Sequence, residues 1–251
     1  MNPHAIEWSI LAPAFLAGLL VLATHVPMGM QVLTRGIVFI DLAIAQIAGL
    51  GVIAADMLGW EPQGWAVQVA AVSAALLGSL LLTHTEKRWP DVQEALIGVL
   101  FVLAASGAIL LLADNPHGGE HLKDLLVGQI LWVSYAQLIP VGLVSALILA
   151  LWFGLSGRLP RLGFYALFAC AVTASVQLVG IYLVFASLII PALATRYARM
   201  PRRLWLGYAV GAGGYGAGLL LSAWSDLPSG AVIVWAMAAI GAVAYGLGVR
   251  R

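Results

Sequence analysis

Apolar runs close to the length of a bilayer-spanning helix, ~20 residues, recur along this chain. They lie at residues 6–26, 37–58, 64–83, 94–113, 134–155, 204–223 and 229–248. A further apolar run at 163–195 is too long for one span and short for two. Because the runs are continuously apolar and do not alternate with a period of two, they indicate helices rather than a barrel. The chain is therefore predicted to be an all-α integral membrane protein, a bundle of about eight or nine transmembrane helices.

The composition indicates that little of the chain lies outside the bilayer. Of the 251 residues, 62% are hydrophobic and only 9% are charged, so a soluble fold would expose large apolar areas. We expect residues 1–251 to form a single transmembrane domain without a soluble catalytic part. The sequence contains no Gly-x-x-x-x-Gly-Lys-Ser/Thr phosphate loop, so the chain is not expected to be an enzyme, and any ATP hydrolysis belongs to another subunit.

Lysine and arginine predict the orientation in the membrane. Of the 12 cationic residues, all but Lys123 fall on one side if the spans alternate, and the positive-inside rule makes that side cytoplasmic. The N-terminus is then outside and the C-terminus inside. The chain between Arg161 and Arg196 must leave the cytoplasm and return to it. We therefore expect residues 163–195 to form two short spans or a re-entrant pair of helices, broken near Gly180.

Asp41 lies inside the second apolar run and is the best candidate for a functional residue. An ionised carboxylate in hydrocarbon costs about 3 kcal/mol on insertion scales, so it is rarely kept without a partner, a water-filled path or a cation. One interpretation places Asp41 on a translocation pathway. The other pairs it with Arg35, six residues earlier and roughly 9 Å away along a continuous helix. Gln46 in the same run and Gln177 in the broken region are further candidates for lining a path.

Residues of metal-ligating types also gather in the loop on the predicted outer side: His117, Glu120, His121 and Asp124. Imidazole and carboxylate groups suit divalent transition metals, so this loop is a candidate for the first outer site that metal reaches. A surface that meets a binding protein, or an ordinary solvated loop, is the alternative. The His-x-x-Glu-His string also matches a protease pattern, but Asn115-Pro116 and Gly118-Gly119 disfavour the helix that such a protease needs.

Four segments carry a family resemblance: Leu96–Phe101, Leu122–Ser134, Ala174–Ala192 and Asp226–Ala231. The most specific is Ala174–Ala192, which contains Ser-Val-Gln near its start and ends in Ile-Pro-Ala. Together they make the chain resemble the membrane permeases of zinc, manganese and iron ABC importers, over residues 10 to 248. The resemblance implies a homodimer in a bacterial inner membrane that imports a divalent metal, zinc or manganese foremost. It implies an extracytoplasmic metal-binding protein and a cytoplasmic ATP-binding subunit as partners, no nucleic acid, and no permanently bound cofactor.

The second span departs from the family pattern beside Asp41. Relatives carry an aspartate and, four residues later, a histidine, both facing the pathway; Asp41 matches the aspartate, whereas Ala45 stands in place of the histidine. Gln46 lies about 140° further round a helix than Asp41 and cannot simply replace that histidine. A carboxylate alone suits Mn²⁺, Mg²⁺ or Ca²⁺ as well as Zn²⁺, so the choice of metal stays open.

The segment that couples relatives to their ATPase is short in this chain. Relatives carry an acidic coupling helix before the Ser-Val-Gln helix, whereas residues 154–163 here are basic and long enough for about one turn. Substitutes lie in residues 83–94 and 196–203, with the following candidate ATPase contacts: Glu86, Lys87, Arg88, Glu94, Arg199, Arg202 and Arg203. Both segments are equally consistent with a solvated topology signal or with contact to lipid headgroups. The alternative function is a secondary transporter, or a membrane partner without ATPase coupling.

Overall fold

The computed structural model describes residues 7–60, 64–113, 115, 118–155 and 159–246, except the side chain of residue 121. This part of the chain is helical and contains no strand, which confirms the all-α prediction. The α-helices are α1 (Trp8–Arg35), α2 (Ile40–Met57), α3 (Trp65–Arg88), α4 (Gln93–Leu111), α5 (Gly118–Val127), α6 (Tyr135–Gly154), α7 (Arg161–Val179), α8 (Ile181–Ala194), α9 (Arg202–Ser225) and α10 (Ser229–Gly246), with short 3₁₀ turns η1 (Pro90–Val92) and η2 (Ile130–Trp132).

Eight helices in the described ranges are long and apolar enough to cross a membrane, and α8 is a shorter apolar helix. The region at 163–195 forms the broken pair that the sequence predicts, because only Gly180 separates α7 from α8. Gly180 has a φ of 81°, a conformation that L side chains rarely adopt. Its Cα also packs against the backbone of Gly128, so that a Cβ at residue 180 would overlap that backbone. A glycine is therefore required where the chain turns from α7 into α8.

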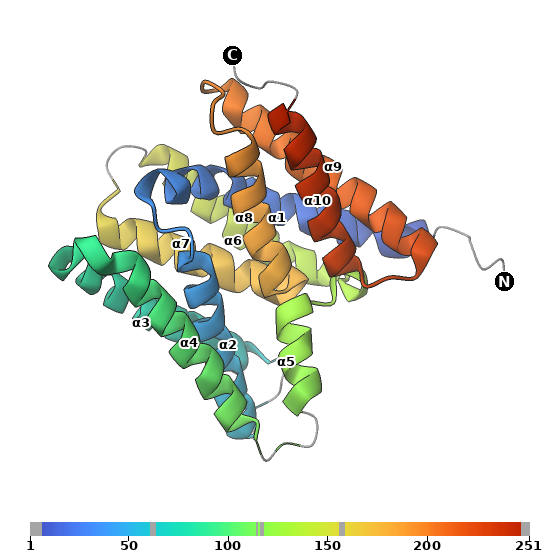
Figure 1. Cartoon of the computed structure of the whole chain (residues 1–251). Coiled ribbons are helices and arrows are strands. Elements are labelled where there is room, and N and C mark those ends of the chain that lie inside the picture. The colour runs from blue at the N-terminus through green and yellow to red at the C-terminus, as the bar shows by residue number, and fades with distance from the viewer. Residues whose placement is uncertain (1–6, 61–63, 114, 116–117, 156–158, 247–251) are drawn as a thin grey trace.

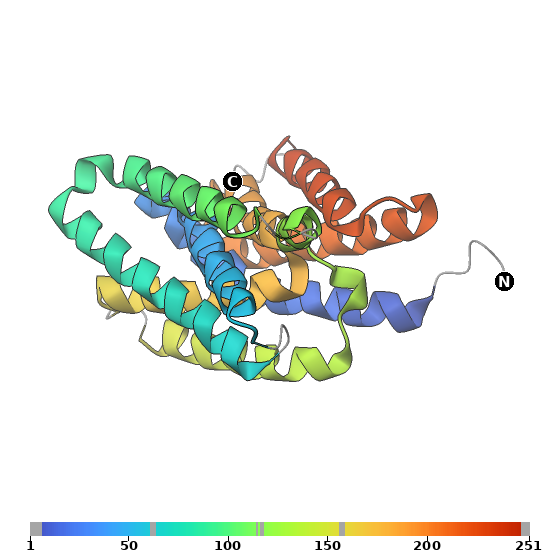
Figure 2. The same ribbon diagram turned by 90° about the horizontal axis from the view of Figure 1, so that it is seen from below.

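The helices form a central group with flanks on two sides. In α1, α2 and α7 more than half of the apolar window is buried within the chain, against about a fifth in α4, α6 and α10. Figure 1 shows α3 and α4 on one flank and α9 and α10 on the opposite one, and the view in Figure 2 agrees. The central helices therefore carry the residues that lipid cannot reach, and the outer ones offer surfaces to lipid or to another subunit.

Small residues let α9 closely approach two of its neighbours, α1 and α10. Gly211 packs on Leu22 of α1, and Gly218 packs on the backbone of Ile233 of α10. In the reverse direction, Gly18 of α1 accommodates the ring of Tyr215 of α9. The small-residue spacing on α9 therefore serves packing within the chain, which is the usual role of such stripes in membrane helices.

Two elements differ from the sequence-based expectation. The first helix continues to Arg35, beyond the apolar run at 6–26, with Pro27 inside it. The segment after Asn115 forms helix α5, so the expectation that its glycines prevent a helix was wrong. The reason is tertiary: Leu122 and Leu125 of α5 pack with a small buried cluster from α2 and α4. That burial outweighs the low helix propensity of two glycines at the helix start.

Candidate translocation site

Asp41 is the second residue of α2 and is completely buried. Helix α2 packs against α3, α4, α7 and α8, so it is enclosed by protein on several sides. Among the residues that the structure describes, neither carboxylate oxygen of Asp41 has a hydrogen-bond partner. Buried polar groups are nearly always hydrogen-bonded, and a charge without a partner is the most costly exception. Asp41 is thus poised to accept a cation or a proton rather than to stabilise the fold.

Arg35 is not the partner of Asp41. Its guanidinium lies 4.0 Å from the centre of the Phe164 ring of α7, a cation–π contact. The helix ends at Arg35, because Gly36 takes a left-handed conformation with a φ of 70°, and α2 begins only at Ile40. The distance expected from a continuous helix therefore does not apply, and the pairing between Arg35 and Asp41 is not formed.

The two glutamines predicted to line a path lie in different environments. Gln46 is buried on α2, and Ala45 beside it is fully buried. Gln177, in the last turn of α7, is exposed on the surface of the single chain. The structure therefore places Asp41 and Gln46 inside one chain and Gln177 where lipid or another subunit would meet it.

The N-terminus of α2 is capped by a residue from another helix. Its own N-cap residue, Phe39, offers no side-chain cap, and the backbone N–H of Phe39 instead donates to Oε1 of Glu94 at 3.2 Å. Glu94 lies in the first turn of α4, 55 residues along the chain. A carboxylate at a helix N-terminus satisfies free N–H groups and interacts favourably with the helix dipole. The side chain of Glu94 is thus directed at α2, two residues from Asp41.

Removing this cap should loosen the start of α2. We expect Glu94→Ala to lower stability by roughly 1 kcal/mol, which corresponds to about 2–4 °C in the melting temperature of a chain this long. Glu94→Gln keeps an acceptor oxygen and should lose less. The measurement is thermal unfolding in detergent, with Asp91→Ala as the control, because Asp91 is an exposed carboxylate of the same connection. Equal losses for Glu94→Ala and Asp91→Ala would show that the cap has no role.

The other candidate ATPase contacts differ in exposure. Lys87 and Arg88 are exposed at the end of α3, whereas Glu86 is partly buried. In the second charged segment, Arg199 and Arg202 are exposed, and Arg203 is partly buried with its guanidinium 3.5 Å from the carbonyl oxygen of Ala192. Lys87 and Arg88, together with Arg199 and Arg202, are the predicted contacts that a partner could reach directly.

Sequence analysis missed a buried histidine on α1. His25 is fully buried near the end of the first apolar run. Its Nδ1 lies 3.0 Å from the carbonyl oxygen of Val21 and 3.0 Å from Oγ1 of Thr24, while its Nε2 is buried without a partner among the described residues. His25 could have been identified from the sequence by the criterion that identified Asp41, which is an ionisable side chain inside a predicted span.

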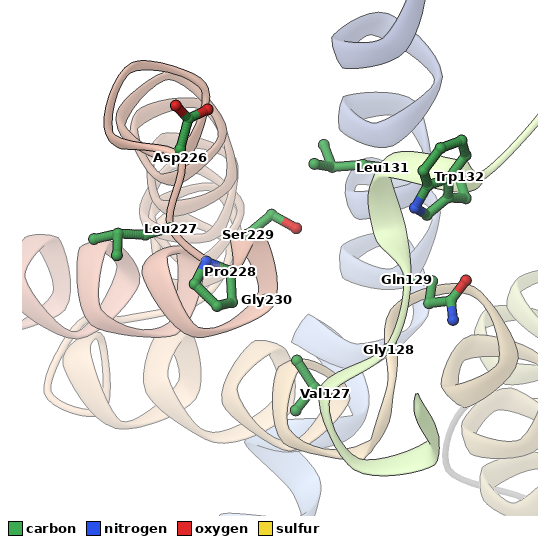
Figure 3. A pocket seen from close by; sticks show the side chains of 10 residues that line it. All are labelled: Val127, Gly128, Gln129, Leu131, Trp132, Asp226, Leu227, Pro228, Ser229 and Gly230. Carbon is green, nitrogen blue, oxygen red and sulfur yellow. The ribbon is translucent and has the colours of Figure 1, made fainter. Parts of the chain in front are cut away.

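The predicted outer loop is only partly described. His117 and the side chain of His121 lie outside the described residues, while Glu120 and Asp124 are exposed on α5. Beyond α5 lies a pocket of about 310 Å³ lined by residues 127–129, 131–132 and 226–230. Figure 3 shows it between the segment that leads from α5 into η2 and the turn between α9 and α10. With Asp226 as its single carboxylate, the pocket is better suited to a protein contact than to a metal ion.

Comparison with known proteins points to one family. The family model described as the ABC 3 transport family matches residues 7–159 and 149–246. The manganese transport system membrane protein MntC of Halalkalibacterium halodurans is 27% identical, over 96% of this chain and 88% of that protein. The high-affinity zinc uptake system membrane protein ZnuB of Haemophilus influenzae is 24% identical, over 90% of this chain and 93% of that protein.

Solved structures share the fold. The chain superposes on one in the structure of PsaBC from Streptococcus pneumoniae in complex with Fab, with a TM-score of 0.76 and 20% identity, covering 97% of this chain and 92% of the other. An inward-facing putative metal-chelate type ABC transporter gives a TM-score of 0.70 at 20% identity, covering 94% and 84%. Both structures therefore share the overall helical fold of this chain.

Proposed function

The chain belongs to the ABC 3 transport family, and we propose from this membership that it is the membrane permease subunit of an importer for a divalent metal ion, zinc or manganese foremost. The observation that carries the choice of cargo is Asp41, a fully buried carboxylate whose two oxygens have no partner in the described part of the chain. A cation in transit would compensate that charge at the moment of passage. Relatives named for manganese and zinc transport support the same cargo class.

The mechanism proposed is alternating access. Metal delivered on the outer side would pass between the helices that enclose α2, reach Asp41, and leave when the two copies of the chain reorient. A homodimer is supported by the outer faces of α4, α6 and α10, which are mostly unburied within one chain, and by the exposure of Gln177. In this arrangement the N-terminus lies outside the bacterial inner membrane and the C-terminus in the cytoplasm.

ATP hydrolysis is assigned to a separate cytoplasmic subunit. The connection between α6 and α7 runs only from Leu155 to Pro160, too short for a coupling helix of the usual length. We place the main ATPase contact on the α3–α4 connection, where Lys87 and Arg88 are exposed. Glu94, in the first turn of α4 directly after this connection, caps α2. A displacement of the connection by the ATPase would therefore be transmitted to the helix that carries Asp41.

Purification with the products of neighbouring genes tests this function. We expect an ATP-binding subunit to co-purify with the chain in a fixed ratio and to hydrolyse ATP faster when a metal-loaded binding protein is added. A double charge reversal, Lys87→Glu with Arg88→Glu, should weaken the association. Metal flux driven by a proton gradient, with no ATPase bound, would instead favour a secondary transporter.

The outer loop is proposed as the first site that metal reaches. His117 and His121, with Glu120 and Asp124, offer imidazole and carboxylate ligands. The binding protein would dock at the pocket of Figure 3, which begins at Val127, the last residue of α5. Replacing both histidines by alanine is expected to lower uptake several-fold at limiting metal and to leave uptake at saturating metal unchanged. An equal loss at both concentrations would argue against a role in capture.

A further inference from the structure

His25 resembles Asp41 in being a fully buried ionisable side chain with a polar atom that has no partner in the described part of the chain. It is fully buried on α1, one of the three most enclosed of the eight long spans in the described ranges. A histidine that serves only packing usually has both ring nitrogens satisfied or one at the surface. Here Nδ1 is held and Nε2, equally buried, has no partner among the described residues.

The contacts of Nδ1 determine which nitrogen is free to bind a ligand. The carbonyl oxygen of Val21 can only accept, so its 3.0 Å contact with Nδ1 is a hydrogen bond only when Nδ1 carries the proton. In the neutral imidazole the lone pair is then on Nε2. An Nδ1–H directed at a backbone carbonyl, with a free Nε2, is the arrangement in which proteins present histidine to a metal ion.

Helix α8 packs against both α1, which carries His25, and α2, which carries Asp41. One turn after His25, Gly29 packs directly on the carbonyl group of Leu188. Phe39, two residues before Asp41, stacks on Phe185 with ring centres 6.5 Å apart. Phe185 and Leu188 are three residues apart, so they are neighbours along one side of α8. The segments of α1 and α2 that carry His25 and Asp41 therefore pack against the same turn of α8.

We propose that His25 supplies the imidazole ligand of the metal pathway, from α1 instead of from the position on α2 where Ala45 stands. The inference rests on the proposed function and makes its cargo more specific. Imidazole nitrogen favours zinc, manganese, iron and cobalt ions over Mg²⁺ and Ca²⁺, which prefer oxygen ligands. A pathway with both His25 and Asp41 would thus exclude the abundant hard cations, which a carboxylate alone would admit.

The test is a spectroscopic search for nitrogen bound to Mn²⁺. The full chain, with its co-purifying ATP-binding subunit, is placed in lipid nanodiscs and loaded with Mn²⁺, and electron spin echo modulation reports a coordinated ¹⁴N. The parent for all variants carries His4→Gln, His117→Ala and His121→Ala. His25→Asn is the informative change, because the asparagine Nδ2 can still donate to the carbonyl oxygen of Val21, whereas the side chain has no atoms in place of Cε1 and Nε2. His84→Gln is the matched control, since His84 is exposed on α3.

The expected result is a ¹⁴N signal in the parent and in His84→Gln that disappears in His25→Asn, with Mn²⁺ affinity weakened on the order of ten-fold. The preference for Mn²⁺ over Mg²⁺ should fall in parallel, while the melting temperature stays close to that of the parent. Bound Mn²⁺ whose nitrogen signal or affinity is unchanged in His25→Asn would overturn the role of His25 and leave the proposed function standing. If the parent binds neither Mn²⁺ nor Zn²⁺, both are contradicted.

Discussion

Asp41→Asn is expected to reduce metal uptake at least ten-fold and, at the same time, to make the protein more stable. Asparagine has nearly the shape of aspartate but carries no charge, so a cation in transit loses its compensating carboxylate. The folded protein in turn no longer buries an unpartnered ionisable group, which is costly. Loss of function with a gain in stability is the pattern of a residue kept for activity. The measurements are metal uptake at equal membrane abundance and thermal unfolding of the purified chain.

Asp56→Asn is the matched control for this prediction. Asp56 lies near the other end of α2 and is only partly buried, so its replacement should leave uptake and stability close to those of the parent. If Asp41→Asn destabilises the protein and leaves uptake unchanged, Asp41 is structural and the pathway has to be sought elsewhere.

Gly180→Ala is expected to give the largest loss of stability of any single methyl addition considered for this chain. The new side chain would have to adopt a φ of 81° and would overlap the backbone of Gly128. Backbone strain and overpacking together cost about 3 kcal/mol or more. We expect strongly reduced abundance in the membrane and a melting temperature lower by several degrees.

Gly98→Ala makes the same chemical change in open space. A Cβ at Gly98 of α4 has no neighbour within 4 Å, and alanine favours a helix over glycine by about 1 kcal/mol. This control should therefore be neutral or stabilising. Similar behaviour of the two variants would mean that Gly180 does not make the close contact with the backbone of Gly128.

The helical spans could be predicted because lipid imposes a simple length and polarity rule on each of them. The break at Gly180 followed from the same rule combined with the charge of the loops. The end of α1 and helix α5 could not be predicted in this way. In each case packing overrides a local signal, since Pro27 is accommodated within a buried helix and Leu122 and Leu125 anchor α5.

The candidate site was predictable in part. An acidic residue in an apolar run identified Asp41, but its spacing from Arg35 could not decide whether the two side chains pair. That depended on Gly36, which ends α1, and on Phe164, which holds the guanidinium of Arg35. The cap that Glu94 provides could not be predicted, because it depends on how α4 packs against the start of α2. His25 carried the same sequence signal as Asp41, but only the packed structure shows that its Nε2 is left without a partner among the described residues.

The central claim is that this chain moves a divalent metal ion by way of Asp41. Its most direct test is the metal content of cells that express the chain with its neighbouring genes, measured for zinc, manganese, iron and cobalt by mass spectrometry. We predict accumulation of zinc or manganese over cells without the chain, and loss of that accumulation with Asp41→Asn at equal membrane abundance. Equal contents of all four metals with and without the chain would contradict the claim.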